Sequence, residues 1–247
     1  MDADEGLSRL RALGFGDADA QELWAHFDGA EQRGKQGHGH ARIPWLEGLE
    51  GYDPSAQPSL LEEEDGFQRW HGGGAIGYLV LGRVVRAQLE RPPAHARLVV
   101  CERTFPTGML GHHVRRLADG GLVALLSATS PRRLGHPSGG PKLAGTNPLA
   151  IGIPSSGGDP VVVDASMGAI TWGDVVAGLA SEEELVPFGG EQAHKAFALA
   201  VGLQLLVDAL VREEGHGAVL LVARPESDPV PALRELAAGV RLPGDSL

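Results

Sequence analysis

The stretch GTNPLAIGIP at residues 145–154, followed by VVVDASMGAITWGD at residues 161–174, decides the fold of this chain. Residues 149–153 and 161–163 are short apolar runs rich in β-branched residues, and turn-forming residues stand beside both, which predicts two buried strands. Residues 97–101, 122–128 and 218–222 have the same character and predict three more. The strands alternate with stretches of helical periodicity, so we expect an α/β protein.

The helical stretches begin near the start of the chain. Residues 5–33 carry leucines at helical spacing, interrupted by GFG at residues 14–16. The glycine-rich segment that follows predicts a loop, and residues 49–66 are polar, acidic and proline-containing, which predicts an exposed connection. Further helices are expected at residues 74–89, 107–118, 194–212 and 231–240.

Composition excludes several classes of partner. The 247 residues include 43% hydrophobic residues and carry a formal net charge of −11. Such a charge repels phosphates overall, so we expect neither nucleic acid nor an anionic membrane as a partner. No apolar run reaches the length of a membrane span, and the acidic start MDADEGLSRL lacks the features of a signal peptide. Cys101 is the single cysteine, which excludes an intrachain disulfide, and we expect a cytoplasmic protein.

Two motifs that are common at functional sites are interpreted here as structural. Residues 72–77 match the G-x-G-x-x-G pattern of dinucleotide-binding turns, but the preceding LEEEDGFQRWH does not resemble a buried parallel strand. We therefore expect a glycine-rich turn that opens a helix. His38 and His40 form an H-x-H pair, yet a zinc site needs further ligands, and the histidines at residues 112–113 lie on a separate predicted helix. We expect no metal ion.

Further motifs complete an ordered set: RGKQGHGHARIPW at residues 33–45, GGEQAHKAFAL at residues 189–199 and VRLPGD at residues 240–245. Together with GTNP and DAS, this set resembles the malate/L-lactate dehydrogenase family of the second type. That family includes ureidoglycolate and sulfolactate dehydrogenases and the reductases of cyclic imino acids such as piperideine-2-carboxylate. The resemblance covers roughly residues 5–200.

The resemblance implies an α/β fold unrelated to the Rossmann dehydrogenases, with a mixed sheet flanked by helices and a helical N-terminal layer. We expect residues 1–65 to form that layer with the substrate loop, packed with residues 226–247. Residues 66–225 would form the cofactor-binding α/β domain. The resemblance also implies NADH or NADPH as cofactor, a small-molecule substrate, and a homodimer with the active site near the subunit boundary.

Two residues of the HGHAR segment match the family's substrate pocket. A guanidinium can bind a carboxylate through two parallel hydrogen bonds, and a 2-oxo, 2-hydroxy or 2-imino acid offers a carboxylate beside the carbon that accepts hydride. The resemblance therefore assigns substrate binding to Arg42 and catalysis to His38. The alternative, an arginine that caps helix carbonyls beside a solvated histidine, stays open.

The resemblance assigns cofactor binding to small, hydroxyl-bearing and charged residues, namely Ser130, Thr146, Asn147, Asp164, Ala165, Ser166 and Lys195. Small residues and hydroxyls let the backbone approach a cofactor, and a lysine can meet its phosphates. Thr146 and Asn147 are equally compatible with plain turn formation.

The chain departs from the family pattern at Pro106. The family's usual general acid or base is a histidine that opens the helix after the strand expected at residues 97–101, and Pro106 stands at that place, as a first-turn residue. The histidines at residues 112–113 follow roughly 9–10 Å further along the helix axis, too far to replace it directly. The segments at residues 172–195 and beyond residue 212 are also shorter than the family norm.

Three functions are compatible with these residues. The first is an NAD(P)H-dependent reductase of a C=N group in a small, carboxylate-bearing or biosynthetic substrate. It tolerates the loss of the acid because a protonated iminium already carries its proton, whereas a ketone needs both a hydride and a proton. The second is a 2-hydroxy-acid dehydrogenase of the malate or lactate type, in which His38, His40 or water replaces the acid. The third is a relative without redox activity that binds a small molecule or a partner protein. We favour the first, an NAD(P)-dependent oxidoreductase.

Overall fold

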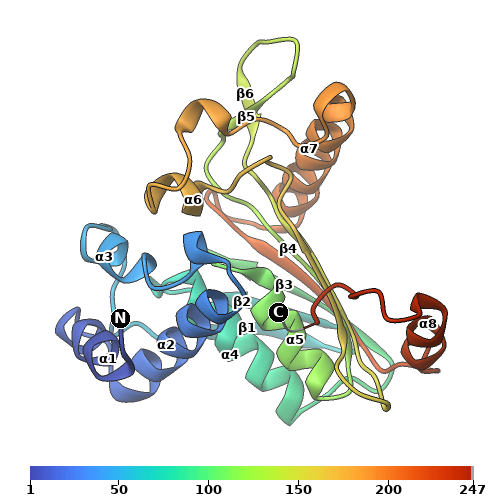
Figure 1. Ribbon diagram of the computed structural model, residues 1–247. Helices are drawn as coiled ribbons and strands as arrows, with labels where there is room; N and C mark the ends of the chain where they lie inside the picture. The colour runs from blue at the N-terminus through green and yellow to red at the C-terminus, as the bar shows by residue number, and fades with distance from the viewer. Residues whose placement is uncertain (246–247) are drawn as a thin grey trace.

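A seven-stranded sheet forms the centre of the computed structural model, which describes residues 1–245 (Figure 1). The strand order is β1-β2-β3-β9-β4-β7-β8. β2 and β3 are parallel and every other neighbouring pair is antiparallel, so the sheet is mixed, as expected. The strands are β1 (Ser59–Glu64), β2 (Phe67–His71), β3 (Ala96–Glu102), β4 (Val123–Ala128), β7 (Leu149–Ile153), β8 (Val161–Ala165) and β9 (Ala218–Ala223). A separate two-stranded ribbon contains β5 (Leu134–Gly135) and β6 (Lys142–Ala144).

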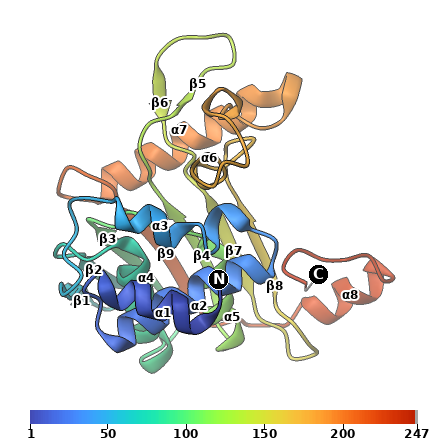
Figure 2. The same ribbon diagram turned by 60° about the vertical axis from the view of Figure 1, so that its left-hand side comes forward.

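Two layers of helices cover one face of this sheet (Figure 2). α4 (Gly77–Glu90) and α5 (Leu110–Asp119) lie directly on it, and their core includes Val84, Leu117 and Leu126. Outside them lie α1 (Ala3–Ala12), α2 (Asp17–Gln32) and α3 (Arg42–Glu47), whose core meets the outer side of α4. Most of α4 is buried because the helix lies between the sheet and the outer helices. The expected helical N-terminal layer is therefore present.

The remaining helices surround the other parts of the sheet. α7 (Ala193–Leu210) packs beside β4, β5 and β6, and α8 (Val230–Ala237) lies beyond β8 (Figure 1). The short helix α6 (Trp172–Val176) and the 3₁₀ turns η1 (Gln36–His38), η2 (Glu182–Glu184) and η3 (Gly190–Gln192) occur in the loops. The boundary expected at residue 65 falls within the β1–β2 hairpin. The C-terminal segment is hydrogen-bonded to β8: the Val162 N–H donates to the Pro243 carbonyl oxygen at 2.9 Å.

The expectation that no apolar run is long enough to cross a membrane is wrong for Gly190–Leu210. This 21-residue helical segment has a mean hydropathy of 1.4, so by length and composition alone it could do so. Its buried side, which includes Ala196, Ala200 and Val207, packs against the sheet and the β5–β6 ribbon. Only 28% of the apolar window is buried, and several leucines on its outer side are exposed.

The five strands expected from apolar runs are confirmed, but β1 and β2 were missed. Residues 59–64 pair with β2 and are not an exposed connection. β2 reads FQRWH and buries Gln68 and Arg69, whose polar groups have partners. Gln88 Nε2 donates to the Gln68 side-chain oxygen Oε1 at 2.7 Å, and Arg69 Nη1 donates to Glu102 Oε1 at 2.8 Å. A strand that buries satisfied polar groups lacks the apolar pattern by which buried strands are recognised.

The G-x-G-x-x-G segment therefore does follow a parallel strand, contrary to expectation, but its first and last glycines serve packing. An added Cβ on Gly72 would lie 2.2 Å from the Arg103 carbonyl oxygen, and one on Gly77 would lie 2.6 Å from that of Pro106. Both glycines let α4 and the turn before it approach the segment at residues 103–106 closely. The expectation of a structural turn that opens a helix agrees with these contacts.

We predict that Gly77→Ala lowers the free energy of unfolding by about 1–3 kcal/mol, because the new methyl overlaps the backbone of residues 104–106. The matched control is Gly202→Ala in α7, where an added Cβ meets nothing within 4 Å. That change should stabilise the protein by about 0.5–1 kcal/mol through helix propensity. Urea unfolding followed by circular dichroism measures both, and equal effects of the two changes would contradict the packing argument.

Candidate functional site

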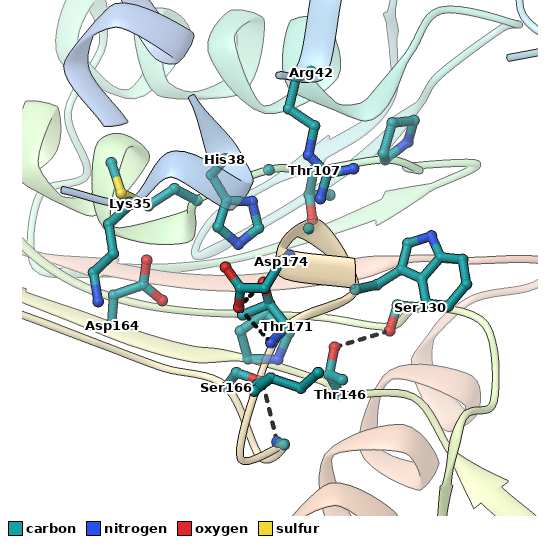
Figure 3. Close-up of a pocket in the computed structure, with 18 of the residues that line it drawn as sticks. Lys35, His38, Arg42, Thr107, Ser130, Thr146, Asp164, Ser166, Thr171 and Asp174 are labelled. Carbon is teal, nitrogen blue, oxygen red and sulfur yellow. Dashed lines mark hydrogen bonds between the residues drawn. The ribbon is translucent and has the colours of Figure 1, made fainter. Parts of the chain in front are cut away.

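A cavity of about 420 Å³ opens between the N-terminal layer and the loops at the ends of the strands (Figure 3). The loop before α3 contributes Lys35 and His38, and α3 itself contributes Arg42. The other walls come from the loop at residues 105–109, the ends of β4 and β8, and residues 166–174. The cavity therefore collects residues from segments that are far apart in the sequence.

Two glycines bring the opposite walls of this cavity together. An added Cβ on Gly37 would lie 2.6 Å from the Asp174 backbone nitrogen, and one on Gly173 would lie 2.2 Å from the Gly37 carbonyl oxygen. The loop that carries Asp174 is shaped by Thr171, whose hydroxyl and backbone N–H both donate to the Asp174 carboxylate at 2.8 Å in a capping box. No larger residue fits at either glycine without moving one of the two loops.

Arg42 places a buried positive charge in this cavity. Its side chain is held at the start of α3, where Nε donates to the Gly37 carbonyl at 2.8 Å and the guanidinium lies 4.7 Å from the ring centroid of Trp45. The residue is only 5% exposed. No carboxylate oxygen of residues 1–245 lies within 4.0 Å of it. Because a buried charge is costly without a counter-charge, the guanidinium is suited to bind an anion in the cavity.

His38 lies beside Arg42 and is neutral. Burial, and then the positive charge of Arg42, lower the pKa of His38 to about 3. Its Nδ1 is buried and has no hydrogen-bond partner among the described residues. A neutral imidazole can accept or donate a hydrogen bond to a ligand but holds no extra proton to give at neutral pH. His40 is directed elsewhere: Nε2 lies 3.1 Å from Asp28, and its ring stacks on Trp24.

Asp164 lies at the opposite side of the cavity from Arg42, near Lys35 (Figure 3). Its Oδ2 accepts a hydrogen bond of 2.7 Å from the backbone N–H of Gly111 in the first turn of α5. Burial raises the pKa of Asp164 to about 6, although the Gly111 bond and the charge of Lys35 act in the other direction. Its carboxyl group therefore changes charge close to neutral pH.

Pro106 lines the cavity, but it does not occupy the first turn of a helix as expected. α5 begins at Leu110, and Pro106 lies in the preceding loop, after a cis peptide bond to Phe105. Proline has no ionisable group, so Pro106 itself supplies no acid to the cavity. Of the histidines in the described chain, only His38 lines this cavity.

The other histidines near this loop form a buried cluster behind it. The ring centroid of His26 lies 4.5 Å from that of His112 and 5.2 Å from that of His113. His26 Nε2 accepts from the Met109 backbone N–H at 3.0 Å. Burial lowers the pKa of all three, so the cluster is neutral. Within residues 1–245 no group of three or more His, Cys, Asp or Glu side chains is arranged to hold a metal ion.

The structure brings six of the predicted site residues to the cavity: His38, Arg42, Ser130, Thr146, Asp164 and Ser166. It does not bring Ala165, Asn147 or Lys195 there. Asn147 is fully buried and holds a turn, since its amide donates to the Ala200 carbonyl and to Gln204 at 3.0 Å and accepts from Ser130 N–H. Lys195 is an exposed residue of α7.

Sequence reasoning missed several residues of the cavity wall. Lys35 lies in the quoted GKQGHGH segment but was given no role. Thr171 and Asp174 carry the T-x-x-D spacing of a capping box, a signal that could have identified the turn. The Arg133 guanidinium lies 3.8 Å from the Trp172 ring centroid, and no local pattern predicts a contact between residues so far apart in the chain.

Two solved structures with this fold are a reductase and a dehydrogenase. Δ1-piperideine-2-carboxylate reductase from Pseudomonas syringae superimposes with a TM-score of 0.82 at 24% identity, over 98% of this chain and 89% of that chain. Malate dehydrogenase from Pyrococcus horikoshii gives a TM-score of 0.76 at 18% identity, over 98% and 82% of the two chains. The expected fold class is therefore confirmed.

The chain belongs to the malate/L-lactate dehydrogenase family, whose model matches residues 6–185. The resemblance inferred from the motifs is thereby confirmed. A Δ1-pyrroline-2-carboxylate reductase of Pseudomonas fluorescens is 30% identical over 186 residues, which cover 64% of this chain and 54% of the relative. A Δ1-pyrroline-2-carboxylate/Δ1-piperideine-2-carboxylate reductase of Pseudomonas syringae is 30% identical over 73% of this chain and 60% of the relative. The chain thus spans little more than half the length of these relatives, and the family is one of oxidoreductases.

We predict that Asp164→Asn and His38→Asn change the pH dependence of stability in opposite directions. Asp164 takes up its proton at about pH 6 in the folded protein and near 3.8 when unfolded, so its contribution to stability falls as pH rises through this window. The pKa of His38 falls from 6.5 in the unfolded chain to about 3 in the folded protein. Its contribution to stability therefore rises with pH through this window.

The difference in free energy of unfolding between Asp164→Asn and the wild type should therefore increase, in favour of the variant, by on the order of 2–3 kcal/mol as the pH rises from about 4 to 7. His38→Asn should lose stability relative to the wild type over the same range. Urea unfolding at several pH values measures both differences. A difference for Asp164→Asn that does not change with pH would show that this carboxyl titrates normally.

Proposed function

We propose that this protein reduces the C=N group of a small cyclic imino acid whose carboxylate is bound by Arg42. The observation that carries the proposal is the buried Arg42 guanidinium, which faces the cavity with no carboxylate of residues 1–245 as partner. Relatives at 30% identity that carry the names of pyrroline-2-carboxylate reductases support it. Such substrates place a carboxylate directly beside the carbon that is reduced.

The residues around the cavity fit a reduced nicotinamide coenzyme. Hydroxyls of Ser130 and Thr146 lie 3.5 Å apart at one side, and Ser166 lies close by in the same wall (Figure 3). These groups can bind polar atoms of a coenzyme without introducing bulk. When bound, NADH or NADPH supplies the hydride for the reduction, and we propose Ser130, Thr146, Asp164 and Ser166 as the residues that hold it.

The missing acid at Pro106 is compatible with this reaction. An iminium substrate carries its proton on nitrogen, so addition of hydride to carbon completes the reduction and leaves a neutral amine. His38 is neutral and can orient the substrate through a single hydrogen bond. Reduction of a ketone needs a proton donor as well, and His38 cannot act as that donor at neutral pH.

A 2-hydroxy-acid dehydrogenase is the second candidate, and Asp164 is the observation that favours it. Its pKa of about 6 allows this carboxyl to accept or donate a proton near neutral pH. A malate dehydrogenase of Pyrococcus horikoshii is 23% identical over 81% of this chain and 64% of the relative. The two candidates differ in whether a 2-oxo acid is reduced as fast as a cyclic imine.

We predict that the wild type reduces a pyrroline- or piperideine-2-carboxylate with NADH or NADPH much faster than it reduces pyruvate. Arg42→Ala should lower kcat/KM for the imine by about one hundredfold, because it removes a charge-assisted bidentate contact. His38→Ala should cost about tenfold or less, the equivalent of one neutral hydrogen bond. Pro106→His should raise the rate on 2-oxo acids and change the rate on imines little.

The loss of absorbance of the reduced coenzyme measures the steady-state reduction rates of the wild type and the three variants. Circular dichroism checks that each variant is folded. Equal rates of the wild type on ketones and imines would exclude the iminium proposal in favour of the dehydrogenase. Binding of coenzyme without reduction of either substrate would favour the relative that has no redox activity.

We also propose that the protein is a homodimer. The face of the sheet opposite α4 and α5 exposes Leu125 by 37% and Leu221 by 44%. Nearby, the outer side of α7 exposes Leu205 by 61% and Leu206 by 48%. Apolar side chains that gather in this way on neighbouring elements are typical of a surface covered by another subunit.

We predict that Leu205→Glu converts the dimer into a monomer at micromolar concentration, because a buried carboxylate in an apolar interface has no partner. Leu61→Glu is the matched control, since Leu61 is 53% exposed on β1 at the far edge of the sheet. Light scattering measures the mass of each. A monomeric wild type, or a monomer produced equally by Leu61→Glu, would refute this interface.

A further inference from the structure

Two buried polar atoms in the wall of the cavity that contains Arg42 have no hydrogen-bond partner among residues 1–245. They are Nδ1 of His38 and the hydroxyl oxygen of Tyr78. His38 orients the substrate in the function proposed above, but Tyr78 has no role in it, although this residue is only 2% exposed. A buried hydroxyl without a partner costs free energy, so a hydroxyl of this kind in a cavity wall is suited to bind a ligand.

The phenol ring of Tyr78 is held by two aromatic side chains of α2. Tyr78 lies in the first turn of α4, and its ring meets the Phe27 ring edge-on, with 5.2 Å between the ring centroids. The His26 ring meets it in the same way at 4.9 Å. A ring that is packed on these sides has little freedom to turn, so its hydroxyl keeps a defined position.

The same ring lies against the loop that carries Pro106. An added Cβ on Gly108 would lie 2.1 Å from Cε1 of Tyr78, and Gly108 has a φ of 69°. Both the ring and the backbone conformation therefore require glycine at this position. His26 holds the next residue, since its Nε2 accepts from the Met109 N–H at 3.0 Å. Tyr78 thus brings a hydroxyl to the side of the cavity where Pro106 supplies no acid.

The hydroxyl of Tyr78 is neutral and lies within the field of the Arg42 charge. Burial raises the pKa of Tyr78, and the positive charge of Arg42 acts in the other direction. A neutral hydroxyl has one hydrogen to donate and two lone pairs that accept. Because both residues line one cavity of about 420 Å³, a single small substrate can meet both.

We propose that the Tyr78 hydroxyl oxygen accepts a hydrogen bond from the iminium N–H of the substrate whose carboxylate Arg42 binds, a contact that rests on the proposed function. In a cyclic 2-imino acid the nitrogen and the carboxylate are attached to the same carbon, so they require two neighbouring contacts. His38 precedes Arg42 in the same segment and lies beside the carboxylate contact. Tyr78 reaches the cavity from α4 and the Pro106 loop, and so meets the nitrogen.

This contact keeps the proton on the substrate nitrogen without any proton transfer by Tyr78. The positive charge of Arg42 disfavours a second positive charge nearby, whereas a hydrogen bond accepted from the charged form of a group favours that form. When hydride adds to the carbon, the C=N double bond becomes a single bond, and the nitrogen becomes a neutral amine that retains its hydrogen. Tyr78 remains a neutral phenol throughout.

Binding of two stable carboxylates tests the contact without turnover. Pyrrole-2-carboxylate carries a ring N–H beside its carboxylate, and thiophene-2-carboxylate has a similar shape and the same charge with sulfur in place of the N–H. In titration calorimetry, Tyr78→Phe should raise the Kd of pyrrole-2-carboxylate about tenfold and that of thiophene-2-carboxylate by no more than about twofold. The matched control is Tyr52→Phe, which alters the other tyrosine of the chain, stacked on Phe15 outside this cavity, and should change neither Kd.

Equal changes in the two Kd values, or no change in either, would overturn the contact. So would a wild type that binds neither carboxylate at millimolar concentration with or without NADPH. Urea unfolding checks the variant itself: Tyr78→Phe should be at least as stable as the wild type, because it removes a buried hydroxyl that has no partner within residues 1–245. A loss of stability greater than that of Tyr52→Phe would show that the hydroxyl is bound within the protein, which also contradicts the proposal.

Turnover of a pyrroline-2-carboxylate gives a second readout. The pH dependence of kcat reports groups that titrate in the complex, so loss of the acceptor should move its alkaline limb to lower pH by about one unit. A loss of packing alone lowers the rate without moving this limb. A protein that reduces no imine but shows the Tyr78-dependent preference for pyrrole-2-carboxylate refutes the reductase alone. An active protein whose Tyr78→Phe variant keeps that preference and the pH profile refutes the Tyr78 contact alone.

Discussion

The close contact between Gly37 and Gly173 is the constraint on which the candidate site depends. It brings the loop before α3 against the loop before α6, and the Gly37 carbonyl then receives the Arg42 side chain at 2.8 Å. A Cβ on Gly173 would lie 2.6 Å from Arg42 Nη2. One contact therefore forms the cavity wall, orients the guanidinium and limits which residues are tolerated at both glycines.

Burial then determines the charges in the cavity. The same enclosure that buries the Arg42 guanidinium keeps His38 neutral and raises the pKa of Asp164 to about 6. The site thus combines one permanent cation, one neutral hydrogen-bonding ring and one carboxyl group that titrates near neutrality. This combination is complementary to a substrate with a negative carboxylate beside a positively charged iminium.

The buried Arg42 shows how an acidic chain can still offer a site suited to an anion. Its surplus of negative charge is distributed over the molecule, whereas the Arg42 guanidinium in the first cavity is buried, where charges are screened less by water. Local placement, and not net charge, therefore decides which ligands such a protein attracts.

Apolar periodicity was enough to predict five of the strands and most of the helices, because residues that face a core repeat with the period of their element. The same logic failed at β2, where Gln68 and Arg69 are buried with partners on α4 and β3. It also placed Pro106 in a helix, since a proline suits a first helical turn as well as the loop that it occupies. Partners that are distant in sequence leave no local pattern.

The sequence by itself determined the family, the mixed α/β class and six of the residues that line the cavity, because motifs and periodicity are properties of neighbouring residues. Only the tertiary structure decided that Arg42 has no acidic partner within residues 1–245, that His38 is neutral, and that Arg33 and Arg115 line one second cavity. The physical reason is that burial and electrostatic interactions depend on distance in space, and the fold brings together α2, α5 and β8 from separate parts of the chain.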